Sequence, residues 1–76
     1  MQPEDIKALL ESGLTDARAE VTSDGSHVNA IIVSPDFEGL RPVQRQQLVY
    51  KVVSEHIASG AIHAFNMKTL TPAEAG

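Results

Sequence analysis

The chain has 76 residues, of which 42% are hydrophobic and 21% are charged, and its formal net charge is -4 at pH 7. A chain of this length can build one thin core, so we expect a single domain over residues 1–76. It contains no cysteine, which excludes a disulfide framework, a thiolate metal site and a cysteine nucleophile. The acidic balance repels phosphate backbones, so any nucleic-acid site must be a local basic patch.

The first apolar pattern along the chain has helical spacing. Ile6, Leu9 and Leu10 recur at intervals of three and four residues, and Pro3 stands where a first helical turn tolerates proline. We therefore expect a helix over residues 3–12, with Gly13 as its C-terminal stop.

Two strand patterns follow this helix. Residues 17–22 alternate between apolar and polar side chains, and residues 28–33 form a run rich in β-branched side chains. The intervening residues 23–26 have the composition of a tight turn. The two segments are therefore predicted to form a hairpin, with His27 at the turn end of its second strand.

A longer helix and a third strand complete the pattern. After a short turn, Pro42 suits the first turn of a helix that ends near Gly60, and residues 62–70 read as a strand. The apolar stripe of this helix consists of Leu48, Val49, Val52, Val53 and Ile57. Its polar residues, Arg45 among them, are expected to face away from the core. Thr71, with Glu74 three residues later, indicates a capped helix after the third strand.

The order of these elements predicts an α+β fold of two layers. A hairpin cannot cover its own apolar face, so both main helices should pack on one side of a three-stranded sheet. The helical link between the second and third strands favours a mixed sheet. The predicted core residues are Ile6, Leu9, Leu10, Ala30, Ile32, Val49, Val52 and Val53.

Three histidines and the carboxylates are the metal ligands that the composition leaves. His56, on the long helix, is expected to flank the core or to interact with the helix C-terminus. His27 is either a solvated residue or an accessible ligand at the hairpin end, and the pattern leaves both open. His63 shares a face by parity with Phe65 and Met67, so the pattern alone favours a partly buried structural histidine.

No arrangement of an activated nucleophile stands out in the sequence. It has no nucleophile elbow, Walker loop or zincin helix. Ser26 and His27 are adjacent, but neighbouring residues on an extended strand point to opposite faces. We therefore expect no enzymatic turnover by the isolated chain.

Four segments together resemble the BolA family. Residues 62–72 carry a histidine-alanine pair at the start and a threonine-proline pair at the end, as in the family's C-terminal strand signature. Residues 24–28, 37–40 and 46–50 resemble the other family blocks in order and spacing. The resemblance covers nearly the whole chain and is greatest to the short, acidic IbaG-like branch.

This resemblance implies a class II KH-like fold and partnership with monothiol glutaredoxins. In the family, the two proteins share a 2Fe-2S cluster with glutathione, the glutaredoxin side supplies sulfur ligands, and the BolA side supplies histidine. The histidine of the third strand maps onto His63, and His27 is the candidate in the hairpin loop for a second ligand. The isolated chain is expected to bind no cofactor and to be a monomer or a weak dimer.

Two other functions compete with this adaptor role in cluster trafficking or iron-status signalling. A nucleic-acid-binding transcriptional regulator would use the KH-like order with Arg41, Arg45 and Lys51, yet the sequence has no GXXG loop and these residues are expected to form a solvated face. Weak, salt-sensitive DNA binding is the most that this predicts. The third possibility is an interaction module whose histidines have no ligand role.

The sequence also favours a cytoplasmic protein. No apolar run approaches the roughly 20 residues that a membrane-spanning helix needs. The first residues, Met1 to Asp5, are acidic where a signal peptide would be basic.

Overall fold

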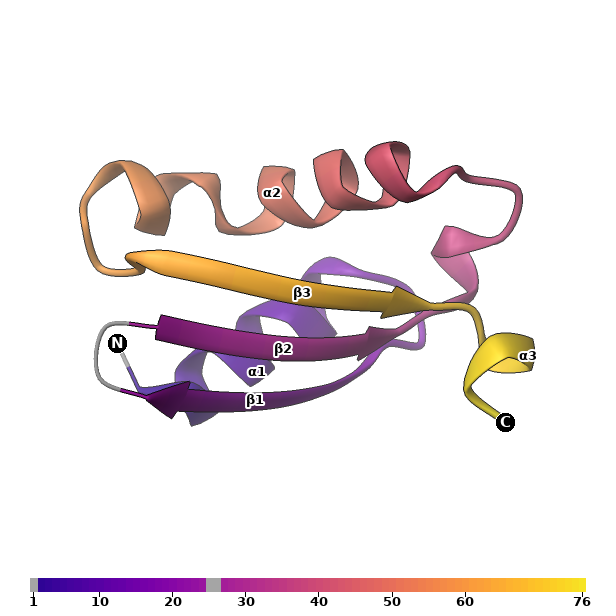
Figure 1. Cartoon of the computed structure of the whole chain (residues 1–76), viewed down its shortest axis with the longest axis horizontal. Helices are drawn as coiled ribbons and strands as arrows, with labels where there is room; N and C mark the ends of the chain where they lie inside the picture. Colours follow the sequence, from indigo (N-terminus) through magenta and orange to yellow (C-terminus); the bar gives the residue numbers. More distant parts are fainter. Residues whose placement is uncertain (1, 25–26) are drawn as a thin grey trace.

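The computed structural model describes residues 2–24 and 27–76. Its elements in chain order are α1 (Pro3–Gly13), β1 (Arg18–Asp24), β2 (His27–Val33), the 3-10 turn η1 (Pro35–Phe37), α2 (Pro42–Ala58), β3 (Ala64–Leu70) and α3 (Pro72–Ala75) (Figure 1). This order confirms the predicted α+β fold.

The strand boundaries differ from the expected ones next to the hairpin turn and at the start of β3. The β1–β2 ladder continues to the pair of Asp24 with His27, so β1 is longer than predicted. The expected third strand began at Ile62, but Ile62 is buried and its N–H donates to the His56 carbonyl at 3.0 Å. The chain is therefore still turning at that point, and β3 begins at Ala64. Gly25 and Ser26 of the predicted turn lie outside the described residues.

The three strands form one mixed sheet in the order β1-β2-β3. β1 is antiparallel to β2, whereas β2 is parallel to β3. Parallel neighbours cannot be joined by a tight turn, so the chain crosses over through η1 and α2 before it returns in β3. As a result β2 and β3 begin at the same end of the sheet (Figure 1).

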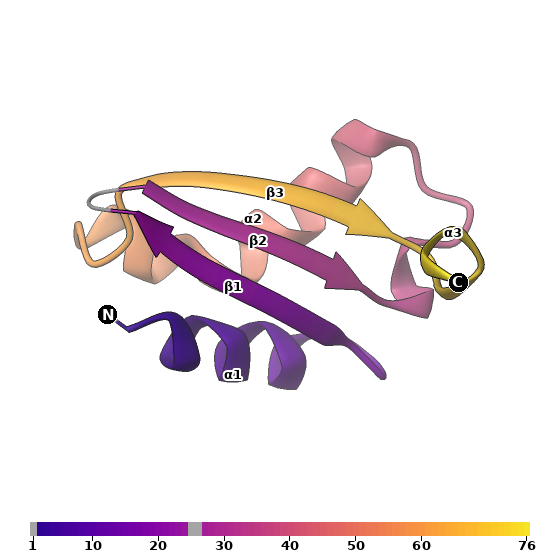
Figure 2. The same ribbon diagram turned by 60° about the horizontal axis from the view of Figure 1, so that its bottom comes forward.

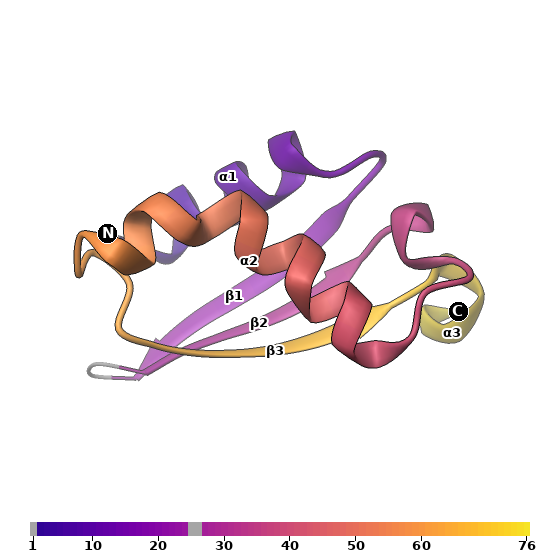
Figure 3. The same cartoon turned by 90° about the horizontal axis from the view of Figure 1, so that it is seen from above.

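Both long helices cover one face of the sheet. Figure 3 looks onto this face, with α1 and α2 in front of the strands. Along β2, Val28, Ala30 and Ile32 are buried while the residues between them are more exposed, which is the period of a strand with one covered face. The predicted two-layer arrangement is confirmed.

The core lies between the helices and this face. Its buried residues are Ile6, Leu10, Leu14, Ala19, Val28, Ala30, Ile32, Phe37, Val49, Val53 and Ile62. Of the predicted core, Leu9 and Val52 are only partly buried at its margin. Phe37 was not predicted, yet it is completely buried, because η1 turns this aromatic ring under the crossover instead of leaving it in a surface loop.

The three α-helices of the described chain begin in the same way, with proline at the first helical position. In each, the residue before the proline donates its backbone N–H to the side chain three residues later. These bonds join Gln2 to Asp5 at 3.0 Å, Arg41 to Gln44 at 2.8 Å and Thr71 to Glu74 at 2.8 Å. Each helix start therefore has a cap encoded by residues close together in sequence.

Gly13 does not act as the left-handed stop that the sequence suggested. It is the last residue of α1, and the positive φ in this region belongs to Asp16, at 46°. A Cβ on Gly13 would lie 2.6 Å from Cγ1 of Val52, so the glycine permits α1 and α2 to approach each other. The requirement is for space between helices and not for an unusual backbone angle.

We predict that Gly13→Ala lowers the free energy of unfolding by about 1–3 kcal/mol, although alanine is ordinarily the better helix former. Val52 is β-branched and has one preferred rotamer in a helix, so it cannot easily turn aside. Urea unfolding measures the effect. When Val52 is replaced by alanine, Gly13→Ala should lower the free energy of unfolding by less than it does in the chain with Val52. An equal loss with Val52 and with Ala at position 52 would contradict the steric explanation.

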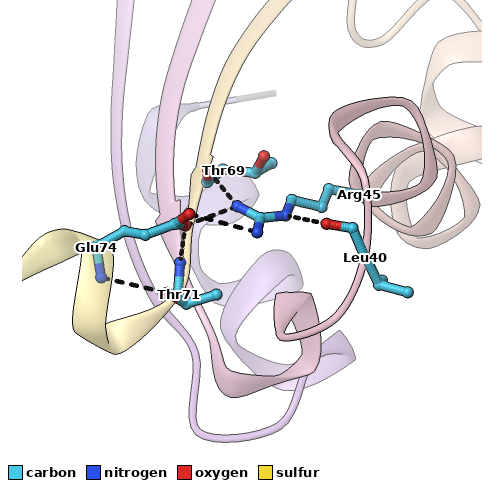
Figure 4. A network of polar contacts seen from close by, with 5 residues as sticks. All are labelled: Leu40, Arg45, Thr69, Thr71 and Glu74. Carbon is cyan, nitrogen blue, oxygen red and sulfur yellow. Dashed lines mark hydrogen bonds and ion pairs between the residues drawn. The ribbon is translucent and has the colours of Figure 1, made fainter.

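Arg45 corrects the expectation that the polar residues of α2 form a solvated face. Its side chain is only 13% exposed and forms an ion pair of 2.7 Å with Glu74. Nε donates to the Leu40 carbonyl at 3.0 Å, and Nη1 donates to the Thr69 carbonyl at 3.3 Å (Figure 4). One side chain thus joins the start of α2, the end of β3 and α3.

Helix side chains also bond to the outer backbone of the sheet at both edges. Glu11 of α1 accepts the N–H of Ala19 on β1 at 3.0 Å, as Arg45 of α2 bonds the carbonyl of Thr69 on β3. Ala19 and Thr69 are both paired with Ile32, so they belong to a single row across the sheet. The two edges are therefore capped at the same level.

The Arg45–Glu74 contact predicts how stability depends on pH. The hydrogen bond from Arg45, aided by the Thr71 N–H, lowers the pKa of Glu74 from 4.5 to about 2. Since the folded pKa lies below the unfolded one, the stabilisation is complete above about pH 5 and is lost as the pH falls towards 2. Glu74→Gln should therefore have a lower Tm than the unmodified chain at neutral pH, and the difference should disappear near pH 2. Thermal unfolding across this pH range tests it.

Glu38→Gln provides the matched control, since Glu38 is exposed and its carboxylate has no hydrogen bond or ion pair among the described residues. Its Tm should follow that of the unmodified chain at every pH. A Glu74→Gln deficit that persisted unchanged at pH 2 would show that the carboxylate is not the titrating group.

Candidate functional site

The parallel pairing of β2 and β3 brings two of the three histidines to one end of the sheet. His27 is the first residue of β2, and its Cα is paired with that of Ala64, the first residue of β3. His63 directly precedes Ala64. Its Cα is therefore within about 9 Å of the His27 Cα, because parallel strands lie about 4.8 Å apart and consecutive Cα atoms about 3.8 Å apart.

The position of His63 is fixed by the turn that precedes it. Gly60 adopts a φ of 82°, and its N–H donates to the Ile57 carbonyl at 3.1 Å, which ends α2. Ile62 then inserts into the core with 1% exposure. His63 is the next residue and its side chain is exposed, so a buried anchor holds an accessible imidazole.

The expectation of a partly buried His63 is thus wrong. Phe65 and Met67, which share its parity, are half-buried against the core, but His63 precedes the strand and lies outside the covered face. Phe65 also makes an edge-to-face contact with Tyr50 of α2, with ring centroids 6.2 Å apart. The helix therefore covers the strand from Phe65 onward and leaves the histidine open to a partner.

His27 is also exposed, but on the face of the sheet that carries no helix. The next residue, Val28, is buried among the helices, and alternation along β2 directs His27 to the opposite side. The antiparallel partner of His27 is Asp24, at the end of β1. The two candidate ligands thus share one end of the sheet, and both are exposed there.

His56 does not belong to this pair. It lies in the last turn of α2 and is half-buried, as expected for a residue that flanks the core. Its backbone carbonyl accepts the N–H of Ile62 and the hydroxyl of Ser59. The contribution of His56 to the site is thus through its backbone, which shapes the turn before His63.

The histidines and carboxylates of this chain suit a metal site shared with another molecule better than a site built from this chain alone. Across residues 2–24 and 27–76, no group of three or more His, Asp or Glu side chains is placed to hold a metal ion. Two exposed imidazoles can supply one or two ligands, and the remaining ligands would have to come from another molecule. Imidazole is a common ligand for iron, and His replaces Cys at one iron of some two-iron clusters.

The basic residues along α2 and at its N-cap do not form a continuous patch. Arg41 and Lys51 are exposed, but the guanidinium of Arg45 is held by Glu74 and by two carbonyl groups. Of the three basic residues considered for nucleic-acid binding, two are therefore available to phosphates. This weakens the alternative of a nucleic-acid-binding regulator.

Comparison with known proteins identifies the family. A family model described as "BolA-like protein" matches residues 1–74. The chain belongs to the BolA family. The "Acid stress protein IbaG" of Escherichia coli K12 is 39% identical over 74 residues, which cover 97% of this chain and 88% of that protein.

Solved structures of BolA proteins have the same fold. The structure of a bolA protein homologue from Coxiella burnetii superposes with a TM-score of 0.88 at 38% identity, covering 99% of this chain and 96% of that one. A bol-like protein from Babesia bovis has a TM-score of 0.78 at 35% identity, covering 97% and 88% of the two chains. In the part of the chain that the structure describes, no helix combines the length and apolar character needed to cross a membrane.

Sequence reasoning named both histidines of this candidate site but missed the residue that positions one of them. Ile62 was assigned to the strand, whereas it is the core anchor of the preceding turn. The sequence contains a signal for this role, because Gly60 two residues earlier is typical of a helix end in the left-handed conformation. An apolar residue soon after such a glycine often packs back onto the helix it follows.

The basic residues of α2 provide a test of nucleic-acid binding. We predict weak DNA binding. The logarithm of the association constant should fall with the logarithm of the salt concentration with a slope no steeper than about −2, since Arg41 and Lys51 can neutralise two phosphates. Fluorescence anisotropy with duplex DNA at several salt concentrations measures this slope. Lys51→Ala should reduce its magnitude by about 1, and Lys7→Ala on α1 is the control. Sequence-specific binding that survives physiological salt would favour the regulator instead.

Proposed function

We propose that this BolA-family chain is a non-catalytic adaptor that pairs with a monothiol glutaredoxin. In the pair it supplies histidine ligation to a 2Fe-2S cluster that is shared with the glutaredoxin and glutathione. The observation that carries the proposal is the placement of His63 and His27, both exposed, at one end of the sheet in a chain without cysteine. Such a chain can complete the ligand set of a 2Fe-2S cluster only together with a partner that brings thiolate ligands.

The residue types suit a cluster that must be passed on. A histidine-ligated two-iron cluster has a higher reduction potential than one held by thiolates alone. The ligand must be the neutral imidazole, so acidification removes the lone pair that binds iron. His63 is presented on a turn anchored by Ile62, and this arrangement fixes the backbone while leaving the side chain exposed.

The proposal extends to the organisation and setting of the protein. Residues 1–76 act as one BolA domain, since the helices, the sheet and the turn before His63 share a core. The proposed role is non-catalytic, in keeping with a sequence that has no nucleophile elbow, Walker loop or zincin helix. The setting is cytoplasmic iron-sulfur trafficking or iron-status signalling.

We predict that His63→Ala abolishes the spectral signature of the mixed complex and leaves the fold intact. The side chain is exposed and carries little of the core, so the free energy of unfolding should change by less than about 0.5 kcal/mol. The measurement is visible circular dichroism after mixing the variant with a cluster-loaded monothiol glutaredoxin. Binding to the cluster-free glutaredoxin should change much less, because ligation is the interaction removed.

The other two histidines are the matched controls. His56→Ala should have almost no effect, since its contacts are made by the backbone carbonyl. His27→Ala should weaken the mixed complex: a loss as large as that of His63→Ala would identify a second ligand, and a smaller one a residue that lines the site. A mixed complex of normal spectrum and stability formed by His63→Ala would overturn the assignment of this residue.

A further inference from the structure

The sheet face opposite the long helices is open along most of the strands, and α3 borders it only where β2 and β3 end, with Ala75 beside Val33 and Leu70. In Figure 2 the strands lie in front of α2, while α3 stands beyond the end of β3. The residues of this open face form rows across the three strands. The central row consists of Glu20, Ile31 and Lys68, which are paired in register.

This central row has an unusual arrangement of charge. Ile31 is 43% exposed, one of the large apolar side chains that the fold leaves in solvent. An acidic residue stands on one side of it and a basic residue on the other, each one strand spacing of about 4.8 Å away. Among the described residues, the one ion pair joins Arg45 and Glu74. Neither Glu20 nor Lys68 therefore forms an ion pair there.

The neighbouring rows are compatible with a flat contact. On one side, Thr22, Asn29 and Asn66 are in register, and the Asn66 amide donates to the Asn29 side-chain oxygen at 3.3 Å. These short side chains leave a shallow hollow beside Ile31 that Glu20 and Lys68 also line. On the other side, Val33 and Leu70 are half-buried and add apolar surface. Arg18, which is paired with Val33, adds an exposed positive charge two residues from Glu20.

We propose that the open face binds a second copy of this chain, with the two sheets stacked face to face about a two-fold axis parallel to the strands. This axis places Ile31 against Ile31 of the second copy. It also exchanges the two outer strands, so Glu20 of each copy faces Lys68 of the other. The row is therefore complementary to itself, as a two-fold interface requires.

The charges select this arrangement among the possible ones. A two-fold axis across the strands would place Glu20 against Glu20 and Lys68 against Lys68, and like charges in contact are unfavourable. Aligned sheets pack about 10 Å apart with strand directions within about 30° of each other, which suits an axis along the strands. The proposal goes beyond the adaptor function and does not depend on it. Because His27 lies on the same face, the axis also sets His27 against His27 of the second copy, so the dimer and the mixed complex compete for this residue.

The test uses two charge reversals, measured by sedimentation equilibrium at low salt. The unmodified chain should form dimers that weaken as salt is added. Glu20→Lys and Lys68→Glu should each raise the dimer dissociation constant at least about tenfold, because each variant faces two like-charged pairs. An equimolar mixture of the two variants should dimerise again, since every pair across the mixed interface is then opposite in charge.

Control variants and alternative outcomes make the test decisive. Lys51→Glu and Glu55→Lys reverse exposed charges on α2 and should leave the association unchanged. Ile31→Asp should abolish it, with far-UV circular dichroism confirming that the variant is folded. The proposal is overturned if the unmodified chain stays monomeric up to about 1 mM, if the mixture of reversed chains does not recover, or if the α2 controls have the same effect as the reversals.

Discussion

The parallel pairing of β2 with β3 is the constraint on which the rest of the structure depends. It requires a crossover, and the crossover supplies η1 and α2, whose Phe37, Val49 and Val53 fill much of the core. The same pairing sets the starts of the two strands side by side. An antiparallel β3 would have carried His63 to the far end of the sheet, away from His27. The topology that builds the core thus also builds the candidate site.

The two faces of this sheet have different tasks. One is covered by helices and stabilises the fold, and the end from which His63 emerges is held by the buried Ile62. The open face carries polar and charged residues around a lone exposed Ile31, an arrangement suited to contacts that form and dissociate. A small chain can therefore offer an end and a face to different partners without altering its core, with His27 belonging to both surfaces.

The fold could be predicted from the sequence because its main signals are local. Alternation along β2, the apolar stripe of α2 and the proline-led helix starts each depend on residues within one element. Arg45 and Gly13 were misjudged because their roles depend on Glu74 and Val52, which are distant in sequence. For the site, the pattern placed the two histidines near the starts of the second and third strands. It could not give the exposure of His63, which depends on how deeply Ile62 inserts.

The caps on the two sheet edges have a consequence for how the chain behaves when crowded. A sheet with open edges can add strands from other molecules and grow into fibres. Here the carboxylate of Glu11 and the guanidinium of Arg45 occupy the outer backbone groups of Ala19 and Thr69. A strand added along either edge would have to displace one of these bonds to extend past that row. Growth by backbone pairing is therefore discouraged at this end of the sheet, while the end that holds the histidines stays open.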